Sequence, residues 1–375
     1  AFAEYYPLAP DTHRAILIAL IIIFYIGKLV WKFIQSRNLN VRFMEGLLQQ
    51  APTQQDAISA AGSEEVAMLQ KRFEEAVVVL KNATLGKKHA FFSKFNRQYV
   101  YELPWYIFIG APGSGKTTAL VNSGLQFPLA ERFGQEVVRG IGGTRNCDWW
   151  FTNEAVLLDT AGRYTTQESH QEQDSAAWGG FLKLLKKYRP RRPINGIIVT
   201  LSVTDLLQQT ALQREAQANS IRKRIQELHS ELNIRFPIYV LVTKTDLLGG
   251  FMEFFGKYGK EERMQVWGTT FPLSENEDVI PLANFDSEFT LLEQRLNSRL
   301  IDYLQDEKDI QKRALLYIFP QQFSALKDTL RDFLNQIFSL SRFNQPPLLR
   351  GIYFTSGIQE GNPIDRIISG FARAL

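Results

Sequence analysis

The chain has 375 residues, enough for two domains or one large one, and 45% hydrophobic and 22% charged residues describe an ordinary globular protein. A net charge of +4 is compatible with an anionic membrane surface or nucleic acid, but no long run of Lys and Arg stands out, and we expect no nucleic-acid partner. The single cysteine, Cys147, excludes an internal disulfide framework and a cysteine-rich zinc site, and we expect it to be a small buried residue.

The first apolar stretch predicts a transmembrane helix over residues 14–35. Its apolar part runs from Ala15 to Ile34, which is 34 − 15 + 1 = 20 residues, and a helix of that length spans roughly 30 Å, about one hydrocarbon core. A buried core helix or an uncleaved signal sequence are the alternatives. Basic residues follow the segment, so the positive-inside rule makes residues 1–13 a periplasmic stub and the rest cytoplasmic. The chain does not begin with Met, so we expect more sequence upstream.

Residues 36–98 are predicted to form a helical linker. Ser63 is a good N-cap, and a helical stripe follows it at Val66, Leu69, Phe73, Val77 and Leu80. We interpret this helix as packing on the following domain. The basic and aromatic stretch 87–97 is predicted either to contact lipid headgroups or to pack as an amphipathic helix.

A phosphate-binding motif follows. Residues 110–117 fit G-x-x-x-x-G-K-[ST] between an apolar run, 105–109, and a helix-forming stretch. The predicted nucleotide-binding residues here are Gly110, Ala111, Pro112, Gly113, Ser114, Gly115, Lys116, Thr117 and Thr118. The glycines allow backbone N–H groups to turn toward phosphate oxygens. Lys116 is predicted to reach the β- and γ-phosphates and Thr117 to bind Mg²⁺.

The apolar run 156–159 ends in Asp159, which is predicted to hold the Mg²⁺, and Gly162 after it is predicted to sense the γ-phosphate. Thr144 lies where a switch threonine would complete the metal site, although a simple turn explains it equally well. Arg163 stands where Ras-like enzymes carry a water-orienting Gln, so the catalytic residue is unknown and fast hydrolysis is not expected. For Arg163, as for Arg145, a structural salt bridge is favoured over an arginine finger.

Residues 164–175 are predicted to be a mobile switch loop. Two more buried-type strands are predicted at 197–201 and 238–242, with a long helix at 206–232 between them. The second strand leads into Thr243-Lys-Thr-Asp246, which resembles the guanine-reading [NT]-K-x-D element, with Lys244 covering the base and Asp246 accepting its N–H groups. A last strand at 351–357 places Ser356 as a further base contact.

Together these elements predict an α/β P-loop NTPase of GTPase-like order, with a parallel sheet covered by helices on both faces. The predicted core covers residues 99–249, and residues 345–375 add its last strand and a C-terminal helix. Residues 250–344 are predicted to be a mostly helical insertion, with helices at 285–303 and 323–338 and a break at Pro320. The predicted cofactor is Mg²⁺ with ATP or GTP.

The combined motifs resemble those of the IcmF/TssM family, inner-membrane proteins of bacterial type VI secretion systems. The residues that carry the resemblance are Leu103-Pro-Trp-Tyr106, Thr117-Thr118, Ser123-Gly-Leu-Gln-Phe-Pro-Leu129, Gly142-Gly-Thr-Arg-Asn-Cys-Asp-Trp-Trp-Phe151 and Leu158-Asp-Thr-Ala-Gly-Arg-Tyr164. The resemblance covers most of the chain, and the family's Walker lysine and aspartate map onto Lys116 and Asp159.

The resemblance implies a structural role in a membrane complex of the bacterial inner membrane. Its implied partners are TssL-like and TssJ-like subunits, baseplate components, membrane lipid and further copies of the chain. Two alternatives remain from the residues themselves. One is a GTPase of the signal-recognition-particle kind, which also combines G-K-T-T, D-T-A-G-R and T-K-x-D. The other is a scaffold with a vestigial nucleotide site.

Overall fold

A computed structural model describes residues 28, 64–78, 98–126, 147–166, 171–263, 265–272, 282–338 and 347–357. The transmembrane helix expected at 14–35 and the basic stretch 87–97 lie outside these residues, apart from Lys28. Across the parts of the chain that the structure describes, no helix has the length and apolar character needed to cross a membrane.

A mixed seven-stranded sheet forms the core, in the order β2-β3-β1-β4-β5-β7-β6. The strands are β1 (Trp105–Ile109), β2 (Cys147–Phe151), β3 (Val156–Thr160), β4 (Gly196–Ser202), β5 (Pro237–Thr243), β6 (Gly268–Thr270) and β7 (Leu348–Phe354). The five strands β3, β1, β4, β5 and β7 are parallel, as predicted, because helical crossovers connect them. Their apolar side chains are buried, which confirms the predicted α/β class.

The prediction of a purely parallel sheet is wrong at both edges. β2 pairs antiparallel with β3, and β6 pairs antiparallel with β7. For β2 the reason is the short turn 152–155, in which the Thr152 hydroxyl accepts the backbone N–H groups of Glu154 and Ala155. A turn this short can only join antiparallel strands. β6 has three residues, too few to stand out in the sequence.

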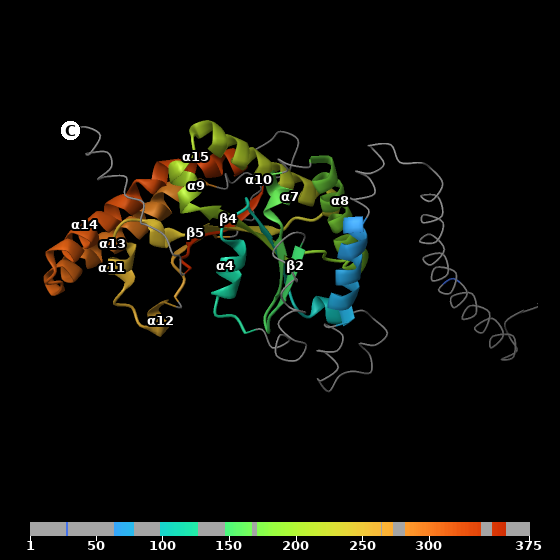
Figure 1. Cartoon of the computed structure of the whole chain (residues 1–375), viewed down its shortest axis with the longest axis horizontal. Helices are drawn as coiled ribbons and strands as arrows, with labels where there is room; N and C mark the ends of the chain where they lie inside the picture. The colour runs from blue at the N-terminus through green and yellow to red at the C-terminus, as the bar shows by residue number, and fades with distance from the viewer. Residues whose placement is uncertain are drawn as a thin grey trace, which may run out of the picture. The chain divides into compact units, whose positions relative to one another are not determined.

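Helices cover both faces of the sheet (Figure 1). α4 (Lys116–Val121) lies on one face, and α8 (Gln171–Tyr188), α10 (Ala211–Leu232) and α15 (Leu326–Phe338) lie on the other. The remaining elements are η1 (Gln98–Tyr101), α7 (Gly162–Thr166), α9 (Val203–Gln208), η2 (Thr245–Leu247), α11 (Phe251–Phe255), α12 (Lys260–Arg263), α13 (Phe285–Asp306) and α14 (Ile310–Ser324). α15 packs against α10, which ties the C-terminal helices to this face.

The helix predicted at 206–232 is two helices, α9 and α10. Thr210 and Gln213 form a capping box, in which the Thr210 hydroxyl accepts the Gln213 N–H and the Gln213 side chain accepts the Thr210 N–H. This arrangement starts a new helix at Ala211. The switch loop expected at 164–175 is also partly helical, because Tyr164 is buried in α7 and α8 begins at Gln171.

The stretch predicted as a helical insertion contains α11 to α15 and the short strand β6. Pro320 does not break a helix, because it lies buried inside α14. An aromatic cluster joins these helices to the sheet: the Phe354 ring of β7 lies 4.9 Å from that of Phe323 and 5.1 Å from that of Trp267. These residues therefore share the hydrophobic core of the sheet.

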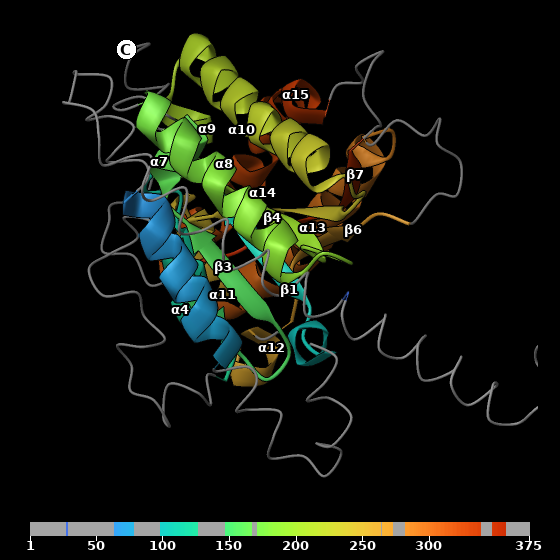
Figure 2. The same ribbon diagram turned by 90° about the vertical axis from the view of Figure 1, so that its right-hand side faces the viewer.

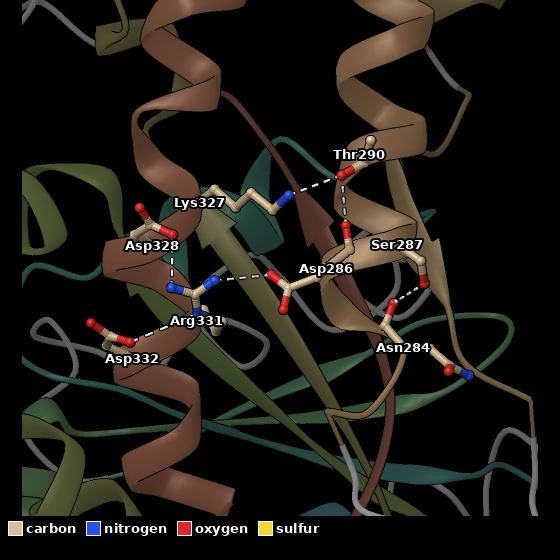
Figure 3. A network of polar contacts seen from close by, with 8 residues as sticks. All are labelled: Asn284, Asp286, Ser287, Thr290, Lys327, Asp328, Arg331 and Asp332. Carbon is tan, nitrogen blue, oxygen red and sulfur yellow. Dashed lines mark hydrogen bonds and ion pairs between the residues drawn. The ribbon is translucent and has the colours of Figure 1, made fainter.

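On the surface, polar contacts link α13 to α15 (Figure 3). Arg331 donates to Asp286 at 3.2 Å and pairs with Asp328 of its own helix at 2.8 Å, and Lys327 donates to the Thr290 hydroxyl at 2.9 Å. Exposed pairs of this kind are screened by solvent and contribute little to stability. The buried apolar face of α15 is what holds the helix in place.

Before the first strand in sequence, residues 64–78 form a helix, called the linker helix below (Figures 1 and 2, blue). Leu69, Phe73 and Ala76 are buried. The first two belong to the helical stripe predicted from the sequence, and Ala76 does not. The Phe73 ring lies 4.5 Å from that of Trp149 in β2 and stacks on Tyr188 of α8 at 5.4 Å. The linker helix is thus packed on the domain, as we expected.

Candidate phosphate-binding site

The loop Gly110–Thr117 connects β1 to α4 at the edge where the parallel strands end. Gly113 and Gly115 have φ values of +73° and +83°, which favour glycine. A Cβ on Gly110 would lie 2.2 Å from the Thr200 hydroxyl oxygen, so no larger residue fits there. Gly115 caps α4 without a side chain, which leaves no side-chain cap over the first N–H groups of the helix.

Two threonines hold this loop on the sheet. The hydroxyls of Thr200 in β4 and Ser114 share a buried hydrogen bond of 2.8 Å. The Thr243 hydroxyl at the end of β5 donates to the Ser114 carbonyl at 2.7 Å. No sequence motif includes Thr200, so its role was not predicted. The signal was present, because a threonine interrupts an otherwise apolar strand and its hydroxyl needs a partner when buried.

Lys116 is buried against the loop. Its Nζ donates to the carbonyls of Gly110 at 2.8 Å and Ala111 at 3.0 Å. Burial lowers the pKa of its ammonium group to about 8, and the nearby Asp159 carboxylate partly opposes that shift. A buried ammonium beside a loop of turned N–H groups is a strong attractor for a phosphate oxygen, because a phosphate supplies the opposite charge that the two carbonyls lack.

Asp159 at the end of β3 is fully buried and lies directly beside Thr117, whose hydroxyl donates to its Oδ2 at 2.5 Å. Within the described residues its Oδ1 has no hydrogen-bond partner. Burial raises the pKa of Asp159 to about 6, against the opposing effects of the Thr117 hydrogen bond and of Lys116. An unpartnered buried carboxylate oxygen next to a hydroxyl fits a Mg²⁺ ion, which uses one or two carboxylates plus phosphate oxygens and waters.

No group of three or more His, Cys, Asp or Glu suited to a metal is found among the residues the structure describes. A metal held by the protein alone is therefore not indicated there. The Mg²⁺ that accompanies a nucleotide does not need such a group, because the phosphates supply ligands. Thr144, the other predicted metal ligand, lies outside the described residues, and so does Arg145.

Gly162 lies against the loop from the β3 side. A Cβ there would lie 2.4 Å from the Pro112 nitrogen, so the close approach requires glycine. The next residue, Arg163, forms ion pairs with Glu65 of the linker helix and Asp174 of α8, and its guanidinium lies 4.8 Å from the Tyr164 ring centre. Arg163 thus forms the salt bridge that we favoured, and its two carboxylate partners hold it away from an arginine-finger role.

The predicted base-reading residues come together at the ends of β5 and β7. The Thr245 hydroxyl donates to the Thr355 carbonyl at 2.8 Å. Lys244 has a left-handed backbone with φ of 59°. Asp246 is buried, and its Oδ1 has no partner in the described parts of the chain. This unpartnered oxygen is the group expected to accept N–H groups of a base.

Ser356 lies next to these residues. It is exposed, and the following residue, Gly357, approaches α4 so closely that a Cβ would lie 2.8 Å from the Thr118 methyl carbon. The segment after β7 therefore reaches the helix of the phosphate loop. Cys147, by contrast, takes no part in such chemistry, because burial raises the pKa of its thiol well above the usual value.

Comparisons with known proteins bear on the same chain. The family model described as the IcmF-related N-terminal domain matches residues 171–375, a range that follows the phosphate loop. The chain is 57% identical to the type VI secretion system component TssM1 of Pseudomonas aeruginosa over 321 residues. The aligned residues make up 85% of this chain. The chain spans about a quarter of that relative, 28% of its length. These matches do not favour a protein of the signal-recognition-particle kind.

Proposed function

The chain belongs to the IcmF/TssM family of type VI secretion components, and from that premise we propose that it is a membrane-anchored part of a secretion membrane complex whose cytoplasmic domain binds a Mg²⁺–nucleoside triphosphate as an assembly switch. The proposed location is the bacterial inner membrane, with residues 14–35 as the anchor. Its proposed partners are TssL-like and TssJ-like subunits, baseplate components, membrane lipid and other copies of the chain.

One observation carries the nucleotide part of this proposal. Three residues from two segments meet at one edge of the sheet, Lys116 and Thr117 at the start of α4 and Asp159 in β3. Thr117 and Asp159 form a direct hydrogen bond, and the Lys116 ammonium group lies close enough for Asp159 to affect its pKa. Two of them carry a feature that a ligand would relieve. Lys116 is a buried cation bonded only to carbonyls, and Asp159 has a buried oxygen without a partner in the described residues.

In this proposal the phosphates lie along the Gly110–Thr117 loop. Lys116 releases its two carbonyls and pairs with a phosphate oxygen. Thr117 and Asp159 would hold the Mg²⁺, which neutralises charge on the phosphates. Gly162 lies beside Pro112, and we propose that its backbone N–H contacts the terminal phosphate.

We propose that hydrolysis of the bound nucleotide is slow. A fast NTPase needs a group that orients the attacking water or a cation that stabilises the transferred phosphoryl group. Arg163 does neither, because Glu65 and Asp174 occupy its guanidinium. Gln167 and Glu168 follow Arg163 closely in sequence and carry groups that could orient a water, but they lie outside the described residues. The site is therefore better suited to a binding switch than to rapid turnover.

We propose guanine as the preferred base. The Asp246 carboxylate is buried with an oxygen left unpartnered in the described residues, which suits the two adjacent N–H donors of guanine. Lys244 would cover the base with its aliphatic stem, and Ser356 lies on the neighbouring segment. Adenine offers no pair of donors on that edge, so it leaves the carboxylate unpaired.

The binding proposal is tested by titrating fluorescent GTP into the wild type, Lys116→Ala and the control Lys183→Ala, an exposed lysine of α8. We expect Lys116→Ala alone to lose binding. Equal binding by all three variants would refute the assignment of the loop. Phosphate release, with Asp159→Asn as the inactive control, then separates a slow NTPase from a binding scaffold.

Base choice is tested by competition between GTP and ATP and by Asp246→Asn. Loss of two charge-assisted hydrogen bonds, at about 1.5–3 kcal/mol each, predicts a loss of GTP affinity of roughly 10²- to 10⁴-fold. Xanthosine triphosphate has a carbonyl where guanine has an amine, so it should regain affinity for the variant. ATP that competes as well as GTP would contradict the guanine proposal.

Complex membership is tested by purification from the native host, which should recover membrane-complex subunits.

A further inference from the structure

The linker helix contacts the candidate site at two separate points. Near its start, the buried Glu65 carboxylate accepts hydrogen bonds from Arg163 and from the Tyr164 hydroxyl. Two turns later, Arg72 Nη1 donates to the Cys147 carbonyl at 3.0 Å and to Asp148 Oδ1 at 3.2 Å.

Both contacts fall on segments that adjoin the groups proposed to bind the nucleotide. Arg163 and Tyr164 directly follow Gly162, which packs on Pro112 of the loop. Asp148 in β2 is the pairing partner of Asp159 in β3, so the strand that Arg72 holds lies beside the carboxylate proposed for Mg²⁺. The linker helix thus attaches to β2 and to α7, the short helix that follows β3.

The polar and apolar contacts of the linker helix lie along one stripe of its surface. Positions 65, 69, 72, 73 and 76 share one face, because they follow the helical repeat, so the polar contacts and the buried Leu69 and Phe73 lie along the same stripe. Val66 closes the other side, since a Cβ on Gly180 of α8 would lie 2.4 Å from its methyl carbon. The stripe therefore cannot shift without disturbing its contacts with β2, α7 and α8.

The Glu65 carboxylate makes this attachment sensitive to small movements. Its side chain is 8% exposed, and the Asp174 side chain that takes the other arm of Arg163 is 1% exposed. A buried carboxylate that loses its partner is strongly disfavoured. A shift of Gly162 would move Arg163 and Tyr164 and so disturb their hydrogen bonds with Glu65. Glu65 belongs to the helix that follows the predicted membrane segment in sequence.

We infer that the linker helix is coupled to nucleotide binding through the Glu65–Arg163–Tyr164 and Arg72–Asp148 contacts. Bound nucleotide stabilises the packing of the helix on the domain, and the packed helix strengthens nucleotide binding. The inference rests on the proposed nucleotide site. Mg²⁺–GTP fixes Asp159 and Gly162, and with them both attachment points of the helix. By thermodynamic reciprocity, the intact contacts raise nucleotide affinity by the same factor, typically about 5- to 150-fold for coupled sites. Glu65 and Arg72 act in this way as positioning residues.

The test combines hydrogen exchange and nucleotide affinity on the whole chain. In the wild type, saturating Mg²⁺–GTPγS should slow backbone exchange in residues 64–78 as well as in the loop. Glu65→Gln should weaken GTP binding by about 5- to 150-fold and should lose the nucleotide-dependent slowing in the linker helix. Arg72→Gln should act in the same direction.

The matched controls are exposed residues one position away. Glu64→Gln makes the same change as Glu65→Gln, and Lys71→Gln, like Arg72→Gln, replaces a cation by glutamine. Both should bind GTP as the wild type does. A purely structural role for Glu65 would lower thermal stability without changing how exchange responds to nucleotide. The wild-type exchange experiment decides the matter even if Glu65→Gln fails to fold.

Two failures can be told apart. If the wild type binds GTP and the loop is protected, but exchange in residues 64–78 is unchanged or faster, the coupling is refuted and the proposed binding site stands. If the wild type and Lys116→Ala both fail to bind GTP, the proposed function is refuted and the coupling falls with it.

Discussion

Replacing Asp159 by asparagine should stabilise the chain in the absence of nucleotide, although it removes a charged group from the heart of the site. Burial raises the pKa of Asp159 from 3.8 to about 6. The folded state therefore binds this proton more tightly than the unfolded state does. The resulting stability is fully present below pH 3.8, is lost as pH rises through 6, and is absent at pH 8.

The magnitude follows from the two pKa values. The difference between 3.8 and about 6 means that ionisation of Asp159 costs the folded chain about 3 kcal/mol at pH 8. Asparagine removes this cost and keeps an oxygen for the Thr117 hydroxyl. Its buried amide N–H₂ needs an acceptor, and leaving it unpaired costs about 1–3 kcal/mol. The expected net gain at pH 8 is about 1 kcal/mol.

The assay is denaturant or thermal unfolding of the wild type and Asp159→Asn at pH 8 and pH 5, in EDTA and without nucleotide. The matched control is Asp302→Asn, the same chemical change at an exposed position of α13. The stability of Asp159→Asn relative to the wild type should fall by about 1.4 kcal/mol between pH 8 and pH 5, as Asp159 of the wild type becomes protonated. The control should show no such change.

A difference between Asp159→Asn and the wild type that is the same at pH 8 and pH 5 would refute the reasoning. So would a variant that is much less stable than the wild type at pH 8. Adding Mg²⁺–GTP should reverse the order, because only the wild type keeps the carboxylate proposed to hold the metal. A chain that carries an unfavourable buried charge in the absence of its ligand is what a binding site under functional constraint predicts.

Three further changes have defined outcomes. GTP affinity of the wild type should weaken about fourfold between pH 7.0 and 8.5 as Lys116, with its pKa of about 8, loses its proton; titrations of Lys116→Arg, which stays charged, should show no such loss. Gly162→Ala should abolish GTP binding in the same titration, because its Cβ would lie 2.4 Å from the Pro112 nitrogen, and retained affinity would show that Gly162 and the loop can move apart. Phe73→Ala should destabilise the chain by about 3–5 kcal/mol in denaturant unfolding, since Phe73 is fully buried; a loss below 1 kcal/mol would contradict the packing of the linker helix.

Local sequence patterns predicted much of this fold because each depends on near neighbours. The strand at 105–109 was predicted with its observed limits, and the runs around 156–159, 197–201 and 238–242 were confirmed within two residues. A continuous apolar run bounded by turn residues is sufficient evidence for a buried strand. The antiparallel strands at the edges were not predicted, because a three-residue strand and a strand placed by a turn carry little signal of their own.

The residues of the candidate site also fall into those that local sequence patterns predict and those that depend on contacts between distant segments. Lys116, Thr117 and Asp159 were selected from motif spacing, and the structure brings Thr117 and Asp159 into hydrogen-bond contact. Thr200 had no motif, and its role depends on β4 pairing beside β1, a contact between residues 91 positions apart. Thr144 stays a prediction, because it lies outside the described residues.

The sequence by itself determined the residue types of the site and the family of the chain, because motif spacing and identity are properties of a linear string. Only the tertiary structure decided which buried groups lack hydrogen-bond partners and which helix packs against the segments beside the site. Glu65 and Arg163 are 98 residues apart in sequence, and their ion pair exists because the linker helix buries Leu69 and Phe73 beside β2 and α8. Burial also shifts the pKa values of Lys116 and Asp159, and burial is set by packing between distant segments.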